Sequence, residues 1–292
     1  MATKTLAKLK SEWSFNKDLT YLVDVMKSIA GTQYHIMERK RTDLAVYKKV
    51  LDELFAVYDF RLVDHPFVRA RKEAKKLICL VTTDFGFLGG LNMKVVQAGI
   101  KQHVQGSHFL VLGERGVNYM REYGLSYTPF PGINPDESRF ELATKVQKEI
   151  FRLVLKNNYG QVILVFPHAA SISSHKVQVL NLIPCPIFFK NKSEQVPTDL
   201  DQEKLSIVES EAEGIIESLT ETWLRHRLLE IIESAKLSEF GARMLHLEDS
   251  FQTLNKIDKL MKLEYFKLRR EKIDQSLRET ATAVLILRES EA

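Results

Sequence analysis

Residues 240–268 read FGARMLHLEDSFQTLNKIDKLMKLEYFKL, and the spacing of their apolar side chains decides the fold of this end of the chain. Steps of four and three residues alternate through Phe240, Met244, Leu247, Phe251, Leu254, Asp258, Met261, Tyr265 and Leu268. All of these are apolar except Asp258, and most residues between them are charged or polar. Such a sustained repeat predicts the seam of a coiled coil. Beyond it the apolar positions move to Ile273, Leu277, Ala281 and Val284, which predicts a local change of winding.

The N-terminal part carries a shorter pattern of the same kind. Its apolar stripe is predicted to follow Leu22, Met26, Ile29, Gln33 and Ile36, and to resume at Leu44, Tyr47, Leu51, Leu54 and Tyr58. Neither long helix can bury its stripe alone, so each is the natural partner of the other. Because both ends lead into the same central region, the simple arrangement is an antiparallel pair.

Proline and glycine divide the chain into three predicted parts. All eight prolines lie between Pro66 and Pro197, together with all glycines except Gly31, Gly214 and Gly241. Proline breaks helix interiors and both residues mark turns, so the middle should be compact and the ends helical. The predicted parts are an N-terminal coiled-coil helix at 1–65, an α/β domain at 66–197 and a C-terminal coiled-coil helix at 198–292.

The middle part alternates short apolar runs with helical patterns. Expected strands are 77–83, 109–113, 161–166 and 186–190, and expected helices are 93–104, 116–122, 137–156 and 171–180. Continuous apolar runs are typical of strands covered on both faces. Their alternation with helices predicts a Rossmann-like α/β domain with a mainly parallel sheet.

Composition excludes several classes of protein. The 292 residues carry a net charge of only +4, which disfavours nucleic-acid binding because that needs a concentrated basic face. Membrane spans and a signal peptide are not expected, because no apolar run approaches the required length. Cys79 and Cys185 lie within apolar runs and are expected to be buried thiols in a reducing compartment.

The glycine-rich segment TTDFGFLGGLN at 82–92 is the strongest candidate for a ligand site. Glycines after a first strand can cradle phosphate, but this segment fits neither common phosphate-binding motif and lacks their lysine. A tight strand-to-helix turn is the favoured interpretation, with Asp84 in a capping or turn role. His168 and His175 could share a helical face, yet no third metal ligand is visible. No catalytic residues, cofactor or metal are expected.

Two basic clusters lie on the predicted terminal helices. These are Glu38–Arg41 and Lys267–Lys272. They are either solvated faces laced with ion pairs or a cationic collar that meets acidic loops of a surrounding protein; composition favours the first interpretation.

Several motifs together resemble the gamma subunit of F-type ATP synthases. The family pattern S-E-x-x-A-R-M matches SEFGARM at 238–244, and Y-N-K-x-R-Q-x-x-I-T-x-E-L is similar to YFKLRREKIDQSL at 265–277. The family segment T-S-D-R-G-L-C-G-G-L-N resembles 82–92, including Asp84, Gly86, Gly89, Gly90 and Asn92. Met26, Lys27 and Ala30 match the N-terminal A-M-K-x-V-A segment. The resemblance covers nearly the whole chain in the family's order.

This resemblance implies a central rotor shaft without an active site of its own. Its partners would be catalytic and non-catalytic ATPase subunits, a small rotor subunit of the epsilon type and the membrane rotor ring, with no nucleic acid. The chain would reach the membrane only through these partners, on the cytoplasmic face of the inner membrane. Contacts with catalytic subunits are expected from Met26, Lys27, Arg243, Arg269, Arg270 and Asp274. The glycine-rich turn would shape the foot domain.

Some positions depart from the family pattern. Arg270, Asp274 and Ser276 replace the family's Gln, Thr and Glu, so contacts at this end of the shaft are expected to differ. The segments MKSIAGTQ and LRREKID resemble a variant, often sodium-translocating, branch. Two other classes stay open: a stand-alone α/β nucleotide-binding protein with a coiled-coil dimerisation arm, and a structural coiled-coil scaffold.

Overall fold

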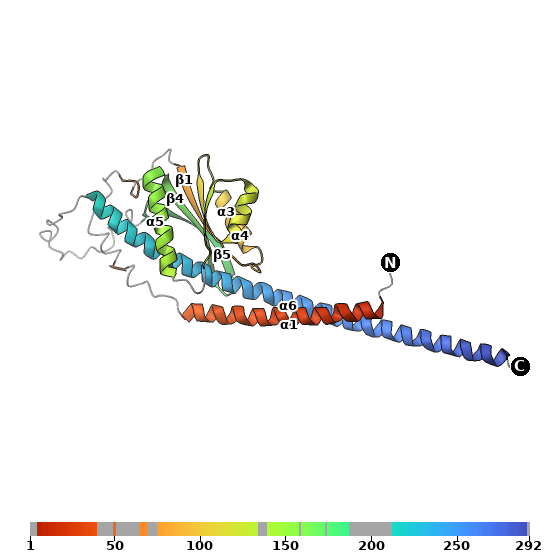
Figure 1. Ribbon diagram of the computed structural model, residues 1–292. Coiled ribbons are helices and arrows are strands. Elements are labelled where there is room, and N and C mark those ends of the chain that lie inside the picture. The colour runs from red at the N-terminus through yellow and green to blue at the C-terminus, as the bar shows by residue number, and fades with distance from the viewer. Residues whose placement is uncertain are drawn as a thin grey trace. The chain divides into compact units, whose positions relative to one another are not determined.

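The computed structural model describes residues 5–39, 49–50, 65–68, 75–133, 139–157, 159–172, 174–186 and 212–290. It divides into two compact units. One comprises Gly31–Arg243, and the other comprises Met1–Ala30 with Met244–Ala292. The first contains an α/β sheet domain, and the second contains segments of the two terminal helices (Figure 1).

A five-stranded sheet forms the core of the first unit, within the part of the chain that the structure describes. Its strands are β1 (Lys75–Val81), β2 (His108–Leu112), β3 (Tyr127–Phe130), β4 (Tyr159–Ser171) and β5 (Ser174–Ile183), in the spatial order β3-β2-β1-β4-β5. All neighbouring pairs are parallel except β4 and β5, which are antiparallel. The predicted α/β class and mainly parallel sheet are therefore confirmed.

Helices cover both faces of this sheet (Figure 1). The helices α3 (Leu91–Ile100) and α4 (Glu114–Tyr123) lie on one face, while α5 (Arg139–Asn157) and the first turns of α6 (Ala212–Ser290) lie on the other. Successive strand residues point to opposite faces: Leu77 and Cys79 join the core with α5 and α6, whereas Ile78 and Leu80 join the core with α3 and α4. The continuous apolar runs of β1, β2 and β4 arise from this double coverage.

Two elements differ from the sequence predictions. Residues 171–180, expected as a helix, instead turn at Ile172 and form most of β5, which pairs with β4 from Val162 to Ser171. The short strand β3 was not predicted; Pro129 at its centre is tolerated because β3 is an edge strand. The strand predicted at 186–190 lies outside the described residues apart from Pro186, which is not in a strand.

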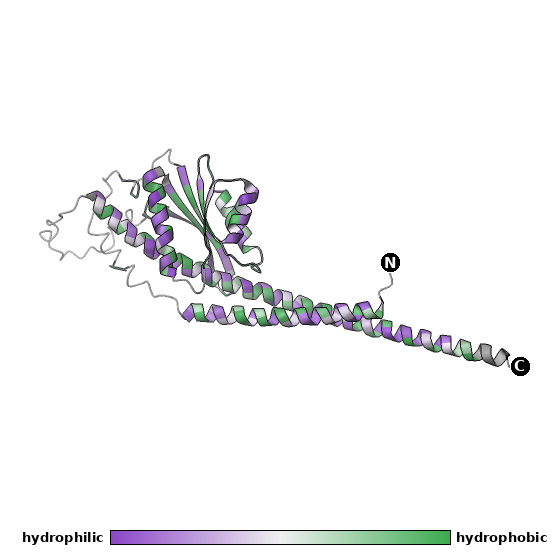
Figure 2. Ribbon diagram, in the orientation of Figure 1, coloured by the Kyte–Doolittle hydropathy of each residue, from purple (hydrophilic) through white to green (hydrophobic). Residues whose placement is uncertain are grey.

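The second unit contains an antiparallel pairing of α1 (Leu6–Arg39) with α6. Trp13 contacts Tyr265 and Lys27 contacts Phe251, so positions rise along α1 as they fall along α6. The predicted seam of α6 is confirmed, because every seam position from Met244 to Leu268 is buried or half-buried, and beyond Phe251 most of the residues between seam positions are exposed. Figure 2 shows this alternation of apolar and polar residues along both helices.

The predicted stripe of α1 is wrong at three of its five described positions, because only Met26 and Gln33 are half-buried. Leu22, Ile29 and Ile36 are about half exposed, at 53%, 52% and 48%. The buried positions are instead Leu9, Asn16, Val23, Ala30 and Tyr34, of which the first four recur at intervals of seven residues. The second half of the predicted stripe runs from Leu44 to Tyr58. Within this range the structure describes only residues 49 and 50. No helix in the described part of the chain is apolar enough over a sufficient length to cross a membrane.

Candidate functional site

Polar contacts cross the helix seam in the second unit. The indole nitrogen of Trp13 donates a 2.7 Å hydrogen bond to Asp258, and the Asn16 amide donates to the carbonyl oxygen of Leu254 at 3.2 Å. The rings of Trp13 and Tyr265 pack with centroids 5.5 Å apart. The one polar residue of the α6 seam is thus matched by a specific donor on α1.

Of Met26 and Lys27, both expected to contact catalytic subunits, Lys27 lies against α6. Met26 is half-buried, and the Lys27 ammonium lies 2.9 Å from Asp24 and 3.1 Å from Glu248. The same ammonium is 4.1 Å from the Phe251 ring centroid. The hydrogen bond to Asp24, together with attraction to Glu248, raises the pKa of Lys27. The Lys27 side chain therefore already contributes to the pairing of the two helices.

Arg269, Arg270 and Asp274 lie where α6 extends past its seam. All side chains described from 269 to 284 are exposed, including the substituted Ser276. Apolar residues share this segment, with Ile273 50%, Leu277 64% and Val284 45% exposed. The helix nevertheless continues to Ser290. We call residues 269–284 the α6 tail; its mixed charged and apolar surface is available for a partner.

Arg243, the remaining predicted contact residue, belongs to a buried charge network in the first unit. Its guanidinium donates to Glu239 at 2.7 Å, and Lys236 donates to the other oxygen of the same carboxylate at 2.9 Å. The side chains of Lys236 and Glu239 are only 4% and 2% exposed. Glu233, three residues before Lys236 on α6, lies 3.3 Å from Arg139 at the start of α5. The charges at helical spacing thus pair within α6, and the ion pair of Glu233 with Arg139 joins α6 to α5.

The glycine-rich turn follows β1 and is held by its own polar side chains. Asp84 accepts hydrogen bonds from the backbone of Glu114 at 2.8 Å and of Gly132 at 3.2 Å. Thr83 donates to the Phe85 carbonyl and accepts from the buried Asn92 amide. Asp84 therefore satisfies the first amide of α4, as the capping interpretation predicts. Gly89 and Gly90 both have positive φ, which glycine adopts without strain.

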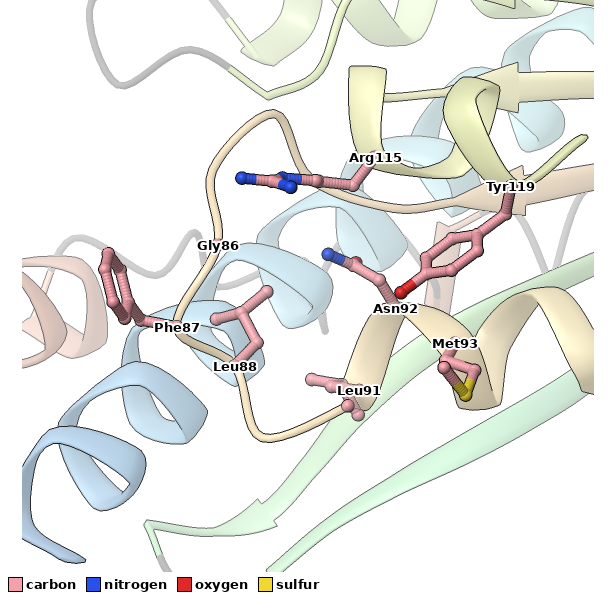
Figure 3. Close-up of a pocket in the computed structure, with 9 residues that line it drawn as sticks. Gly86, Phe87, Leu88, Leu91, Asn92, Met93, Arg115 and Tyr119 are labelled. Carbon is pink, nitrogen blue, oxygen red and sulfur yellow. The ribbon is translucent and has the colours of Figure 1, made fainter. Parts of the chain in front are cut away.

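An open pocket of about 270 Å³ lies beside this turn (Figure 3). It is lined by Gly86, Phe87, Leu88, Gly90, Leu91, Asn92, Met93, Arg115 and Tyr119. Arg115 extends over Gly86, whereas the Phe87 ring points away from the labelled cluster. The start of α3 and the arginine could receive an anionic group. The Asn92 amide is already bonded to Thr83, so little buried polar capacity remains for a nucleotide.

His168, His175 and the two cysteines serve the packing of the sheet domain. His168 and His175 lie on paired strands rather than on a helix, and bond to Ser234 and Ser238 of α6 at 2.7 and 3.1 Å. Within the described residues no group of three potential ligands could hold a metal. Cys79 and Cys185 are fully buried free thiols, as predicted, and burial raises the pKa of Cys79 to about 12.

The sequence motifs were recognisable, but the residues that their side chains contact in the fold were not. The spacing of Lys236, Glu239 and Arg243 at three and four residues could have indicated an ion-pair ladder. Similarly, Asp258 within an apolar seam indicates a polar partner, although no local signal identifies it as Trp13. Gly132 carries no recognisable motif, yet it approaches Asp84 closely.

Comparisons with known proteins agree with this architecture. The family model described as ATP synthase matches residues 5–284. The ATP synthase gamma chain of Bdellovibrio bacteriovorus is 22% identical over 97% of this chain and 99% of its own length. That of Halothermothrix orenii is 26% identical over 74% of each chain. Among solved structures, a chain of the Euglena gracilis mitochondrial ATP synthase complex of OSCP, F1 and c-ring has a TM-score of 0.74, with 15% identity and coverage of 98% and 96%.

Proposed function

Because the chain belongs to the ATP synthase gamma-chain family, we propose that it is the central rotor shaft of a rotary F-type ATP synthase. The shaft couples ion flow through a membrane rotor ring to conformational change at catalytic subunits. The observation that carries the proposal is the α6 tail, an exposed helical extension beyond the seam. A partner that encloses it accounts for its apolar and charged side chains.

The chain acts by contact rather than by catalysis. A shaft shifts the equilibrium of a catalytic site only if it binds one conformation of that site better than another. The α6 tail offers Arg269, Arg270 and Asp274 for such contacts. Lys27 contributes to the neighbouring helix pair, while Arg243 bonds Glu239 within α6.

The sheet domain is the foot of the shaft in this proposal. It engages a small rotor subunit and the membrane ring, and the ring contact is supported by the chain's similarity to a solved central stalk and c-ring of Tetrahymena thermophila. The chain then belongs to a peripheral complex on the cytoplasmic face of the inner membrane, and the complex translocates protons or sodium ions. In this proposal the first helix comprises residues 1–65, the foot comprises residues 66–197 and the second helix comprises residues 198–292.

Purification through an affinity-tagged catalytic subunit from native membranes tests assembly. The full chain is expected among the copurified proteins, identified by mass spectrometry. A variant that ends at Leu268 lacks the α6 tail and is expected to be recovered at a much lower level. Absence of the full-length chain from the purified complex would refute the rotor proposal.

The pocket beside the glycine-rich turn is the observation that favours the nucleotide-binding alternative. Against it, the turn has no phosphate-binding lysine, and its buried Asn92 and Thr83 bond each other. Calorimetric titration of the purified chain with ATP and Mg²⁺ separates the two functions. The rotor proposal predicts no saturable binding at millimolar nucleotide, whereas the alternative requires it.

A further inference from the structure

Two motif segments far apart in the sequence are connected through a pair of loop residues in the first unit. The Asp84 carboxylate accepts the backbone N–H of Gly132 at 3.2 Å. The carbonyl oxygen of the next residue, Ile133, accepts a 2.8 Å hydrogen bond from the ammonium of Lys236, which also donates to Glu239. A continuous path thus runs from the glycine-rich turn to the charge network of α6.

Each step of this path is tightly constrained. A side chain on Gly132 would place its first carbon 2.4 Å from an oxygen of Asp84, so only glycine permits this approach. Ile133 is 6% exposed, and Lys236 is buried with its carbonyl and carboxylate partners. Breaking a bond to a buried ammonium leaves a desolvated charge or carbonyl without a partner, which is costly. The loop is therefore expected to follow any movement of Lys236.

The glycine-rich turn, at the other end of the path, is held by hydrogen bonds of Asp84 and also carries exposed aromatic side chains. Asp84 bonds the first residue of α4, Glu114, at 2.8 Å in addition to Gly132. Directly after it, the aromatic side chains of Phe85 and Phe87 are 64% and 57% exposed, and Phe87 has a φ of 62°. A left-handed backbone at a bulky residue is strained and persists only when its surroundings hold it.

We propose that Gly132 and Ile133 form a tie that couples the position of the glycine-rich turn to α6. Asp84, Lys236 and Glu239 are then positioning residues: displacing the turn shifts Lys236, and displacing α6 shifts Asp84. A role of the tie in transmitting force between foot and shaft rests on the proposed function. The coupling itself is a property of the single chain. It can therefore be absent while the rotor function holds, and it can be present while the rotor function fails.

Amide hydrogen exchange on the purified full chain measures this coupling. Lys236→Met removes the ammonium while Glu239 keeps Arg243 as its partner. The amides of Gly132 and of the distant Glu114 are expected to exchange roughly tenfold faster, because both are held by Asp84. Core amides of Cys79 and Leu164 should not change. Lys148→Met, at an exposed lysine of α5, is the matched control and should alter none of them.

A double variant separates a tie from two independent contacts. If Asp84→Ala and Lys236→Met act independently, their effects on exchange at Glu114 multiply. A tie predicts that the double variant exchanges about as fast as the faster single variant. Glu239→Gln, which keeps the shape of the side chain, provides a milder second variant with the same expected pattern. Faster exchange confined to residues 132–133, or multiplying effects at Glu114, would overturn the proposal.

Discussion

Trp13 and Asp258, 245 residues apart in the sequence, are joined by a 2.7 Å hydrogen bond across the two terminal helices. Asp258 occupies a seam position that is otherwise apolar, where a half-buried carboxylate without a donor would be unfavourable. The indole N–H meets this need, and the Trp13 ring also packs against Tyr265, one helical repeat further along α6. A polar pair of this kind fixes the register of a coiled coil, because a shifted register leaves both groups unpaired.

Replacing Asp258 by alanine is expected to destabilise the chain by about 1–3 kcal/mol, since the indole donor loses its acceptor. Urea unfolding of the full chain measures the change. Asp249→Ala, at an exposed position of α6, is the matched control and should stay within about 0.5 kcal/mol of the native chain. In a Trp13→Phe background the cost of Asp258→Ala should shrink. Equal costs in both backgrounds would contradict a specific pair.

Two glycines of α6 should respond in opposite directions to alanine. At Gly241 an added methyl group would lie 2.6 Å from the His175 ring and 3.3 Å from Tyr34, so overpacking should cost about 1–3 kcal/mol. At Gly214 nothing lies within 4 Å, and Gly214→Ala should stabilise the helix by up to about 1 kcal/mol. Unfolding midpoints of the two variants test this contrast. A stabilising Gly241→Ala would show that the close approach to β5 is absent.

The arginines predicted to contact partners should fall into two classes. Arg243→Ala is expected to lower the free energy of unfolding by about 1–3 kcal/mol, because its guanidinium bonds the buried Glu239. Arg269→Ala, on the exposed α6 tail, should change stability by less than about 0.5 kcal/mol.

For binding to the catalytic subunits, Arg269→Ala is expected to have the larger effect of the two variants. Arg269→Ala is expected to weaken capture by the catalytic subunits roughly tenfold, measured by titration of the purified components. Arg121→Ala, at an exposed position of α4, is the control for loss of charge and should leave capture unchanged. Arg269→Ala and Arg121→Ala with equal affinities would remove Arg269 from the contact surface.

The stability of the sheet domain should fall as pH drops below about 6.5, partly through His175. Burial lowers the pKa of His175, although its hydrogen bond to the Ile172 carbonyl opposes this shift. Between the lowered folded value and the unfolded value near 6.5, the unfolded chain binds more protons, so stability is complete above this window and decreases within it. Burial also lowers the pKa values of His108 and His226.

Urea midpoints of the native chain and of His175→Gln, compared at pH 7.5 and 5.0, isolate the contribution of His175. The variant should lose less stability between the two pH values than the native chain. A loss of the same size in both would mean that His175 is not a source of the acid sensitivity.

The helix seam shows how far periodicity leads. On α6 the four–three repeat predicts the buried positions correctly, because one apolar stripe continues there with only Asp258 interrupting it, while Leu260, Leu263 and Phe266 lie off this stripe and are exposed. On α1 two stripes compete, and the more apolar one, which contains Leu22 and Ile29, stays exposed. The buried one includes Asn16 and Ala30, whose value lies in a hydrogen bond and in small size rather than in hydrophobicity. Such specific fits are invisible to a hydrophobic pattern.

The sheet domain gives a similar lesson. The strands buried on both faces were predictable from their apolar runs, whereas β5 was not, because its outer half is polar and exposed. Its strand conformation depends on pairing with β4 and on the His175–Ser238 contact with α6. The turn role of Asp84 followed from its place after β1, but its partner Gly132 is set by tertiary structure alone.

Single-molecule rotation tests the central claim most directly. Cys79 and Cys185 are buried, so a cysteine introduced by Glu122→Cys, at an exposed position of α4, can carry a bead selectively. With the catalytic subunits fixed to a surface, ATP should drive the bead in one direction. A chain that ends at Leu268 should rotate weakly or detach. A complex that hydrolyses ATP at its normal rate while the bead on the full-length chain stays still would contradict the account.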